Sequence, residues 1–281
     1  MAENKRLLGM AMDFGMGNVP ADERLGYIAE AGFDATFCGW GPNSDLAATA
    51  ALIKKHGLIL QSVHAPFNKV NLLWQKGKDG DAILDMLCSC LDDCAKVGAP
   101  IMVCHVWIGF GKQHPNDIGI ARFSALLDHA ASVGVKVAFE NTEGEKYLEY
   151  LRDKLFSHPA AGFCIDTGHE MCYNYSEDMI TKYGAGGKLI ATHINDNEGI
   201  TGKAITWLDD AHLLPFDGVG DWQGVADRLC AVGYDGILMS ELTTKSKPDR
   251  TTHDIYAHLS CRDYVFLAYE RMKRFAELIT K

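Results

Sequence analysis

The sequence predicts a single-domain α/β protein folded as a (β/α)8 TIM barrel over residues 1–281. First, eight strand-like apolar runs alternate with segments of helical periodicity, which is typical of a parallel sheet with helical crossovers. Second, no linker, low-complexity segment or change of composition divides the chain. Third, barrels of about 250 residues are common. Eight repeats therefore favour a closed barrel over an open sheet.

The predicted strands are short apolar runs bounded by turn residues. In chain order they lie at residues 7–14, 35–38, 58–63, 101–104, 136–140, 162–165, 189–193 and 237–241. The predicted helices carry apolar residues at helical spacing. They lie at residues 21–31, 42–56, 79–97, 117–132, 145–157, 176–183, 221–231 and 252–278. Gly57 is expected as a C-cap and Ser176 as an N-cap. The segment 197–220 is irregular and unusually long.

Composition limits the classes of function that fit. A formal net charge of −10 argues against a nucleic-acid surface, where basic residues must neutralise phosphates. No apolar run approaches the roughly 18–20 residues that span a bilayer. Residues 1–6 lead into a strand-like run rather than the apolar core of a signal peptide. We therefore expect a cytoplasmic protein. Its nine cysteines are scattered without a C-x-x-C pair, as expected for small buried side chains in a reducing compartment.

Carboxylates and imidazoles end many of the predicted strands. Core packing does not explain such endings, because a buried charge is costly unless it is paired or bound to a metal. In a barrel, the C-terminal ends of the strands form the active-site face. The strand-end candidates are His64, His105, Glu140, Asp166, His193 and Glu241, and the candidates just beyond the strands are His169, Asp210 and His212.

The last four strands end in two glutamates, an aspartate and a histidine, namely Glu140, Glu241, Asp166 and His193. Carboxylates mixed with imidazoles suit a borderline divalent cation, so we expect Zn²⁺, Mn²⁺ or Co²⁺. Magnesium is the weaker expectation, because it favours shells made of oxygen alone. The sequence thus predicts a divalent-metal site at one mouth of the barrel.

Five stretches resemble the xylose isomerase-like TIM-barrel superfamily, in the expected order and with similar spacing. They are residues 62–67 (SVHAPF), 139–141 (FEN), 165–169 (IDTGH), 193–196 (HIND) and 240–242 (SEL). The superfamily includes sugar-phosphate isomerases, ketose 3-epimerases, inosose dehydratases and type IV apurinic endonucleases. The resemblance implies the barrel fold and a metal site, and it leaves the sugar and its phosphorylation open.

Site roles also follow from the resemblance. It implies that the metal ligands are Glu140, Asp166, His193 and Glu241, and that the two glutamates act as a catalytic acid/base pair. It implies substrate contact for His169, and either pocket or metal-ligand roles for His64 and His105. We assign Phe67, Trp107 and Asn141 to the substrate pocket. The expected activity is a metal-dependent sugar or sugar phosphate isomerase or epimerase in carbohydrate metabolism, acting through an enediolate.

Two alternatives stay open. Asp210 and His212 resemble the pair that completes the trinuclear metal cluster of type IV apurinic endonucleases, which predicts a phosphoesterase. The third class is a barrel that binds a sugar without turnover. We expect a small-molecule sugar as partner, and neither nucleic acid nor a membrane. The last helix fits a cover for the barrel or a contact in a homo-oligomer. Loop aromatics could form a lid or pack on the rim: Phe67, Trp74, Trp107, Phe110 and Trp207.

Overall fold

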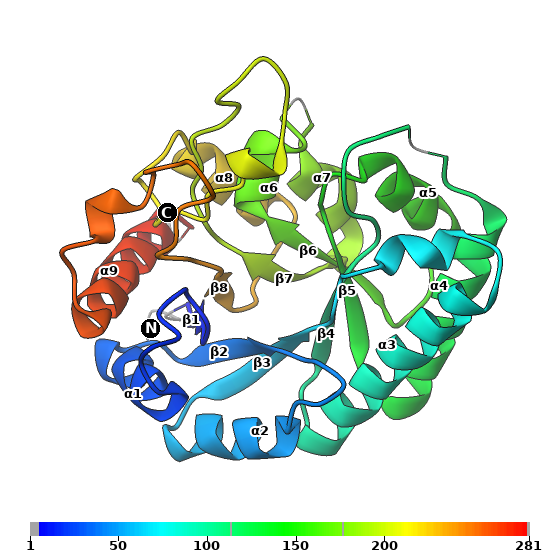
Figure 1. The fold of residues 1–281 in the computed structure, drawn as a ribbon, viewed down its shortest axis with the longest axis horizontal. Coiled ribbons are helices and arrows are strands. Elements are labelled where there is room, and N and C mark those ends of the chain that lie inside the picture. Colours follow the sequence, from blue (N-terminus) through cyan, green and yellow to red (C-terminus); the bar gives the residue numbers. More distant parts are fainter. Residues whose placement is uncertain (1–5, 113, 176, 280–281) are drawn as a thin grey trace.

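Eight parallel strands form one sheet with the order β7-β6-β5-β4-β3-β2-β1-β8 (Figure 1). This computed structural model describes residues 6–112, 114–175 and 177–279. The strands are β1 (Leu8–Ala11), β2 (Ala35–Gly39), β3 (Ile59–His64), β4 (Ile101–His105), β5 (Lys136–Glu140), β6 (Ala161–Asp166), β7 (Leu189–His193) and β8 (Leu238–Ser240). Each pairs in parallel with its neighbours in that order.

A short seam between β7 and β8 closes the sheet into a barrel. Ile194 and Ser240 form an isolated parallel bridge. The amide of Ile194 donates to the carbonyl of Met239 at 2.8 Å, and the amide of Glu241 donates to the carbonyl of Ile194 at 3.2 Å. The predicted (β/α)8 barrel is therefore confirmed, and Glu241 is anchored by its backbone in the closing seam.

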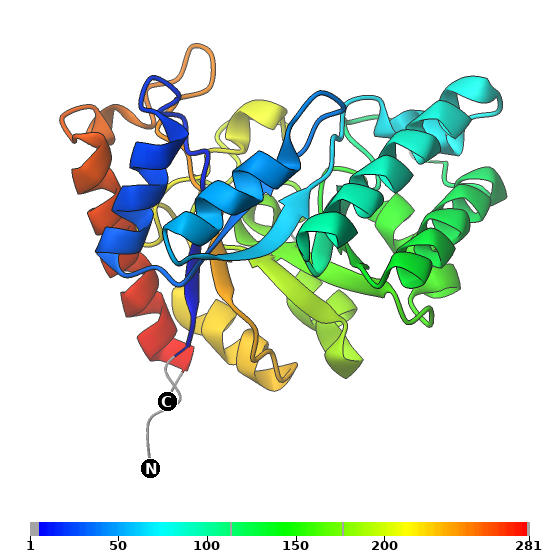
Figure 2. The ribbon, with the colours of Figure 1, turned by 90° about the horizontal axis from the view of Figure 1, so that it is seen from below.

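Helices surround the strands on the outside of the barrel (Figures 1 and 2). The α-helices are α1 (Ala21–Ala31), α2 (Leu46–Lys55), α3 (Lys78–Val97), α4 (Asp117–Val133), α5 (Glu145–Leu155), α6 (Thr167–Cys172), α7 (Met179–Gly184), α8 (Trp222–Ala231) and α9 (Cys261–Ile279). Short 3-10 turns are η1 (Val70–Trp74), η2 (Ala185–Gly187), η3 (Trp207–Asp209) and η4 (Asp254–Tyr256). Within the described ranges, no helix has the combined length and apolar character needed to cross a membrane.

Capping side chains explain where several helices differ from their predicted bounds. α2 begins at Leu46 rather than residue 42, because Asp45 accepts a hydrogen bond from the amide of Ala48 and caps it. α9 begins at Cys261 rather than at residue 252. At this observed start, the hydroxyl of Ser260 accepts a hydrogen bond from the amide of Asp263. The predicted cap Ser176 lies outside the described residues. The N-cap of α7 is Asp178.

The inner face of the barrel carries small apolar side chains below a polar layer. One inner cluster contains Ile101, Val103, Ala138, Cys164 and Ala191. Neighbouring strand residues such as Met102 and Phe139 belong instead to the large core between strands and helices. Side chains alternate along a strand, so the next inward position after each small residue is two residues further on. On β4 to β7 these positions hold His105, Glu140, Asp166 and His193.

Candidate active site

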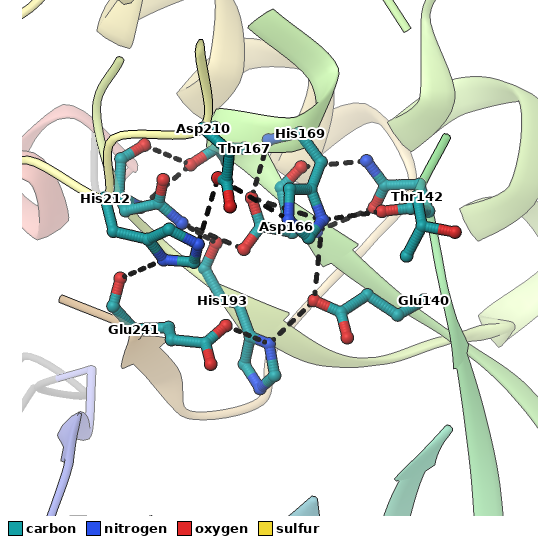
Figure 3. Close-up of polar contacts among 12 residues, drawn as sticks. Glu140, Thr142, Asp166, Thr167, His169, His193, Asp210, His212 and Glu241 are labelled. Atoms are coloured by element: carbon teal, nitrogen blue, oxygen red, sulfur yellow. Dashed lines mark hydrogen bonds and ion pairs between the residues drawn. The ribbon is translucent and has the colours of Figure 1, made fainter. Parts of the chain in front are cut away.

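Polar side chains from the ends of β5 to β8 meet at one mouth of the barrel (Figure 3). Glu140, Asp166 and His193 are fully buried, while the side chain of Glu241 keeps 26% of its surface exposed. The Nδ1 atom of His193 lies 3.0 Å from Glu140 Oε1 and 3.0 Å from Glu241 Oε2. Two carboxylates therefore converge on a single imidazole nitrogen.

Glu140 has imidazoles on both of its carboxylate oxygens. The Nε2 atom of His105 lies 3.0 Å from Oε2, and the Nε2 atom of His64 lies 3.2 Å from the same oxygen. The Nδ1 atom of His193 contacts the other oxygen, Oε1, at 3.0 Å. The ring of Phe67 stacks on His105, with ring centroids 4.6 Å apart. Strands β3, β4, β5 and β7 thus each contribute one member of a buried carboxylate–imidazole cluster.

Asp166 is held by its backbone, by a helix start and by an amide side chain. Its Oδ1 atom accepts from the amide of His169 at 2.7 Å, which makes Asp166 the N-cap of α6. Its Oδ2 atom accepts from Asn195 Nδ2 at 2.9 Å. Gly168 lies against the side-chain oxygen of Asn195, so a Cβ at this position would clash with it. The DTGH stretch therefore combines a strand end, a close approach and the first turn of a helix.

A second set of donors comes from the loop between β7 and α8. Asp210 Oδ1 lies 3.0 Å from His212 Nε2 and 3.6 Å from His169 Nε2. His212 Nδ1 lies 3.0 Å from the carbonyl oxygen of Glu241, and His169 Nδ1 lies 2.8 Å from the carbonyl oxygen of Asn141. These backbone contacts orient both rings, so that their Nε2 atoms face the same carboxylate (Figure 3).

Buried Asp196 organises this long loop. Its carboxylate accepts hydrogen bonds from the amides of Gly218 and Gly220 and from the indole of Trp222. Its backbone pairs with Leu213 in an antiparallel bridge, one residue after His212. These contacts tie the start of the loop to its end, and the loop between them rises in yellow at the top of Figure 1. Asp196 was not predicted as a site residue, although it follows directly after the His-Ile-Asn stretch.

Imidazoles and carboxylates shift each other's pKa values in this buried setting. Burial alone would raise the pKa of Glu140, but the imidazoles of His193 and His105 outweigh it and hold that pKa well below its usual value. Burial opposes the charged form of His193, yet Cys164, Glu241 and Glu140 raise its pKa well above the ordinary value. Without a bound cation, the protonated ring of His193 offsets one of the two negative charges that Glu140 and Glu241 bring to it.

The remaining carboxylates differ from one another. Burial raises the pKa of Asp166, and the nearby charges of His169 and His212 only partly offset this. For Glu241, burial is outweighed by His193, and the pKa is lowered to about 2. For His212, burial is outweighed by Asp210, and the pKa is raised to about 9. Glu241 therefore stays ionised at neutral pH, although it lies among other acids.

Three overlapping groups of side chains bring their donor atoms within 4.8 Å of one another. They are Glu140, Asp166, His193 and Glu241; His64, Glu140 and His193; and Asp166, His169 and His212. A divalent cation held by the three carboxylates would offset their negative charges, because a buried charge is costly unless it is paired or coordinated. The mixture of carboxylate oxygens and imidazole nitrogens suits a borderline divalent metal. The four-donor group therefore fits the expected metal.

A cavity of about 530 Å³ lies above these donors. Its described lining residues are His64, Phe67, Asn71, His105, Ile108, Gly109, Phe110, Glu143, His169, Tyr173, Trp207, Asp210, His212, Glu241 and Lys247. Phe67, Phe110 and Trp207 are half-exposed at the mouth, in loops after β3, β4 and β7. Trp74 is instead buried and donates to the carbonyl of Val106. The predicted lid aromatics thus divide between the mouth and the rim packing.

Two residues assigned to the substrate pocket lie outside the set that lines this cavity. The ring of Trp107 stacks on Tyr147 with centroids 4.1 Å apart. Asn141 is fully buried, and its side chain bonds the backbone of Asp166 through both its oxygen and its nitrogen. Trp107 therefore packs the rim and Asn141 holds Asp166 in place, whereas Phe67 lines the cavity.

Sequence reasoning missed several residues that line the cavity. Tyr173 stacks on His169, with ring centroids 4.9 Å apart. Its spacing of four residues from His169 would have indicated this contact if α6 had been predicted as a helix. Lys247 lies in the loop after β8, and its Nζ atom donates to Asp210 Oδ2 at a distance of 3.1 Å. Its sequence surroundings are those of an ordinary polar loop, so no local pattern indicates this placement.

Comparisons with known proteins agree with this architecture. The family model described as a xylose isomerase-like TIM barrel matches residues 25–259. The protein y4fM of Sinorhizobium fredii is 29% identical over 252 residues, which cover 75% of this chain and 77% of that protein.

Solved structures share the fold at low sequence identity. A D-tagatose 3-epimerase-like protein is 18% identical and covers 98% of both chains, with a TM-score of 0.72. An IOLI protein with a bound zinc atom is 15% identical and covers 97% of this chain and 98% of that chain, with a TM-score of 0.70. At such identities, these similarities establish the fold alone.

Proposed function

The chain belongs to the xylose isomerase-like TIM-barrel family, and we propose that it is a divalent-metal-dependent sugar or sugar phosphate isomerase or epimerase. The observation that carries this proposal is the convergence of Glu140, Asp166, His193 and Glu241, whose donor atoms lie within 4.8 Å of one another. The zinc atom in the IOLI protein and the epimerase named among the structures of the same fold give it further support.

Those four side chains would hold the cation, with zinc, manganese or cobalt as the metals that suit them. When bound, such an ion supplies Lewis-acid chemistry, polarising a carbonyl or hydroxyl group of the sugar and lowering the energy of an adjacent negative charge. The protein contributes the fixed directions of the donors. Asn195 and the amide of His169 orient Asp166, and the closing seam anchors Glu241.

Glu241 and Glu140 are the proposed proton-transfer pair. A carboxylate oxygen removes the proton next to the sugar carbonyl, and the electrons of the broken C–H bond pass into the enediolate. Epimerisation is completed when the partner carboxylate delivers a proton to the opposite face of the same carbon. Isomerisation is completed when a proton is delivered to the neighbouring carbon and the proton of that carbon's hydroxyl group passes to the former carbonyl oxygen. Glu241 lines the cavity and its pKa is about 2, so it is ionised before substrate arrives. Glu140 is fully buried, with its carboxylate 3.2 Å from His64 and 3.0 Å from His105, both of which line the cavity.

The shape of the site fits a small molecule. A cavity of about 530 Å³ lies within the range of small-ligand pockets, roughly 300–1,000 Å³. Phe67, Phe110 and Trp207 surround its mouth and offer apolar faces to a sugar ring. His169 and Tyr173 line the wall, where they can donate to hydroxyl groups. The aromatic mouth also limits access of water to the enediolate.

Hydrogen exchange tests this proposal. The metal-loaded protein is incubated in deuterated water with a panel of ketoses, aldoses and inososes, and incorporation of deuterium next to the carbonyl is followed by NMR. We expect exchange with at least one sugar, and a loss of about 10²–10⁴-fold in Glu241→Gln. Glu149→Gln is the control, because Glu149 lies on α5 with its side chain 44% exposed. Exchange that persists unchanged in Glu241→Gln would remove this residue from the mechanism.

A second candidate, a trinuclear-metal phosphoesterase similar to the type IV apurinic endonucleases, is favoured by a different observation. His64 and His105 flank Glu140, while His169 and His212 flank Asp210. The nine candidates at and just beyond the strand ends are those that the resemblance assigns to such a cluster. Six of them line the cavity, namely His64, His105, His169, Asp210, His212 and Glu241. Glu140, Asp166 and His193 are fully buried. The metal count per chain, together with cleavage of an oligonucleotide containing an abasic site, separates the two candidates.

A further inference from the structure

Lys247 enters the candidate site from the loop that follows β8. Its Nζ atom donates to Asp210 Oδ2 at 3.1 Å, and its side chain is only 23% exposed. The ammonium lies 5.7 Å from the centroid of the Trp207 ring, over its face. It is the one lysine or arginine among the described residues that line the cavity. The ammonium is thus held on two sides, by a carboxylate and by an indole.

The carboxylate of Asp210 is divided between this lysine and two imidazoles. Oδ2 faces Lys247, while Oδ1 lies 3.0 Å from His212 Nε2 and 3.6 Å from His169 Nε2. A metal ion coordinated by Oδ1 and the two rings would lie on the other side of the same carboxylate from the ammonium. Two cations within a few ångströms of each other, in a partly buried site, repel strongly.

We propose that Lys247 is a built-in counter-ion for Asp210 that keeps a further metal ion from binding between His169, Asp210 and His212. This inference rests on the proposed function and concerns the same site. The two ends of the site differ in this respect. Among the described contacts, no lysine or arginine bonds to the carboxylates of the four-donor group on β5 to β8. At the loop-borne end, the ammonium of Lys247 already bonds to Asp210. The site then contains every residue type that a trinuclear centre requires, but it binds fewer than three metal ions.

Metal stoichiometry tests the proposal without reference to activity. Wild-type protein and Lys247→Gln are stripped with a chelator, dialysed against Zn²⁺ or Co²⁺, and analysed for metal per chain by mass spectrometry. We expect Lys247→Gln to bind one more ion per chain, with affinity at the loop-borne end raised by about 100-fold or more. Lys247→Arg keeps the positive charge and is expected to retain the wild-type count. Lys245→Gln, in the same loop and exposed, should also match wild type.

Each other result overturns the proposal. An unchanged count in Lys247→Gln would show that the lysine does not exclude an ion, and a lower count would show that it helps to bind one. A gain of an ion in Lys247→Arg would contradict the role of charge. Circular dichroism monitors folding, and Lys247→Met serves as a second neutral variant if Lys247→Gln does not fold. Absence of sugar exchange in a protein whose metal count responds as expected would refute the proposed function alone.

Discussion

The strand-borne and loop-borne donors of the candidate site reach the same cavity by different routes. Glu140, Asp166 and His193 continue the inward register of β5, β6 and β7, and all three are fully buried. Asp210 and His212 come from an irregular segment, and His212 has a positive φ of 53°. A non-glycine residue persists in that conformation only when its surroundings enforce it.

This difference shows which part of the site depends on which interactions. Hydrogen bonds along the barrel fix the strand-borne donors, so moving one of them requires a shift of a whole strand. The loop-borne donors depend on a few side-chain contacts, above all those of Asp196. We therefore expect strand-borne substitutions to change metal binding itself, and loop-borne substitutions to change stability and access first.

The largest effect is expected from Glu140→Gln. The amide removes a negative charge from a residue that contacts His64, His105 and His193. Metal affinity of the four-donor group should fall by more than about 100-fold, because loss of a direct ligand exceeds the 10–100-fold cost of losing its outer partners. Equilibrium dialysis with Zn²⁺ measures this.

A buried glutamate outside the donor cluster provides the control for that measurement. Glu170 is paired with Arg228 at 2.7 and 2.8 Å and is 8% exposed. Glu170→Gln should reduce stability while leaving metal affinity close to that of wild type. Equal losses of affinity in both variants would indicate general damage to the barrel rather than loss of a ligand.

An intermediate effect is expected from pH. In the metal-free protein, burial lowers the pKa of His193, but the neighbouring Cys164, Glu241 and Glu140 raise it. The resulting pKa lies well above the ordinary value of a histidine. A proton must therefore leave before this ring can bind a metal, and affinity should rise with pH across the neutral range, by up to about tenfold per unit for one proton. Calorimetry in buffers of different ionisation enthalpy should detect proton release. Affinity that falls or stays constant between pH 6 and about pH 8 would contradict this.

The smallest effect on metal binding, and the clearest on the loop, is expected from Asp196→Ala. It leaves the amides of Gly218 and Gly220 and the indole of Trp222 without their acceptor, which should cost roughly 3 kcal/mol in the free energy of unfolding. Urea unfolding measures the loss, and limited proteolysis should cut within residues 197–221. Metal should still bind the four-donor group.

Asp221→Ala is the matched comparison for the loop variant. Asp221 caps α8 by accepting from the amide of Gly224 at 3.0 Å, so its loss should cost about 1 kcal/mol without exposing the loop. If Asp196→Ala were no less stable than Asp221→Ala, the carboxylate of Asp196 would not be the main clamp on this loop.

Much of the strand-borne half could be predicted from the chain alone. A polar residue at the end of an apolar run indicates a strand terminus at the active-site face, and this pattern alone indicates Glu140, Asp166, His193 and Glu241. Local spacing could not show that Trp107 would stack on Tyr147, or that Asn141 would bond Asp166, because these partners depend on how loops pack against the rim. Lys247 was missed for the same reason.

The sequence by itself determined the alternation of strands and helices and the chemical character of the strand ends, because hydrophobic periodicity and buried charge are local properties of a chain. Only the tertiary structure decided which loop residues share the cavity with them. Lys247 and Asp210 are 37 positions apart in the sequence, and their contact depends on the closure of β8 against β7 and on the folding of the Asp196 loop. Such long-range placement follows from the packing of the whole barrel and leaves no local pattern to read.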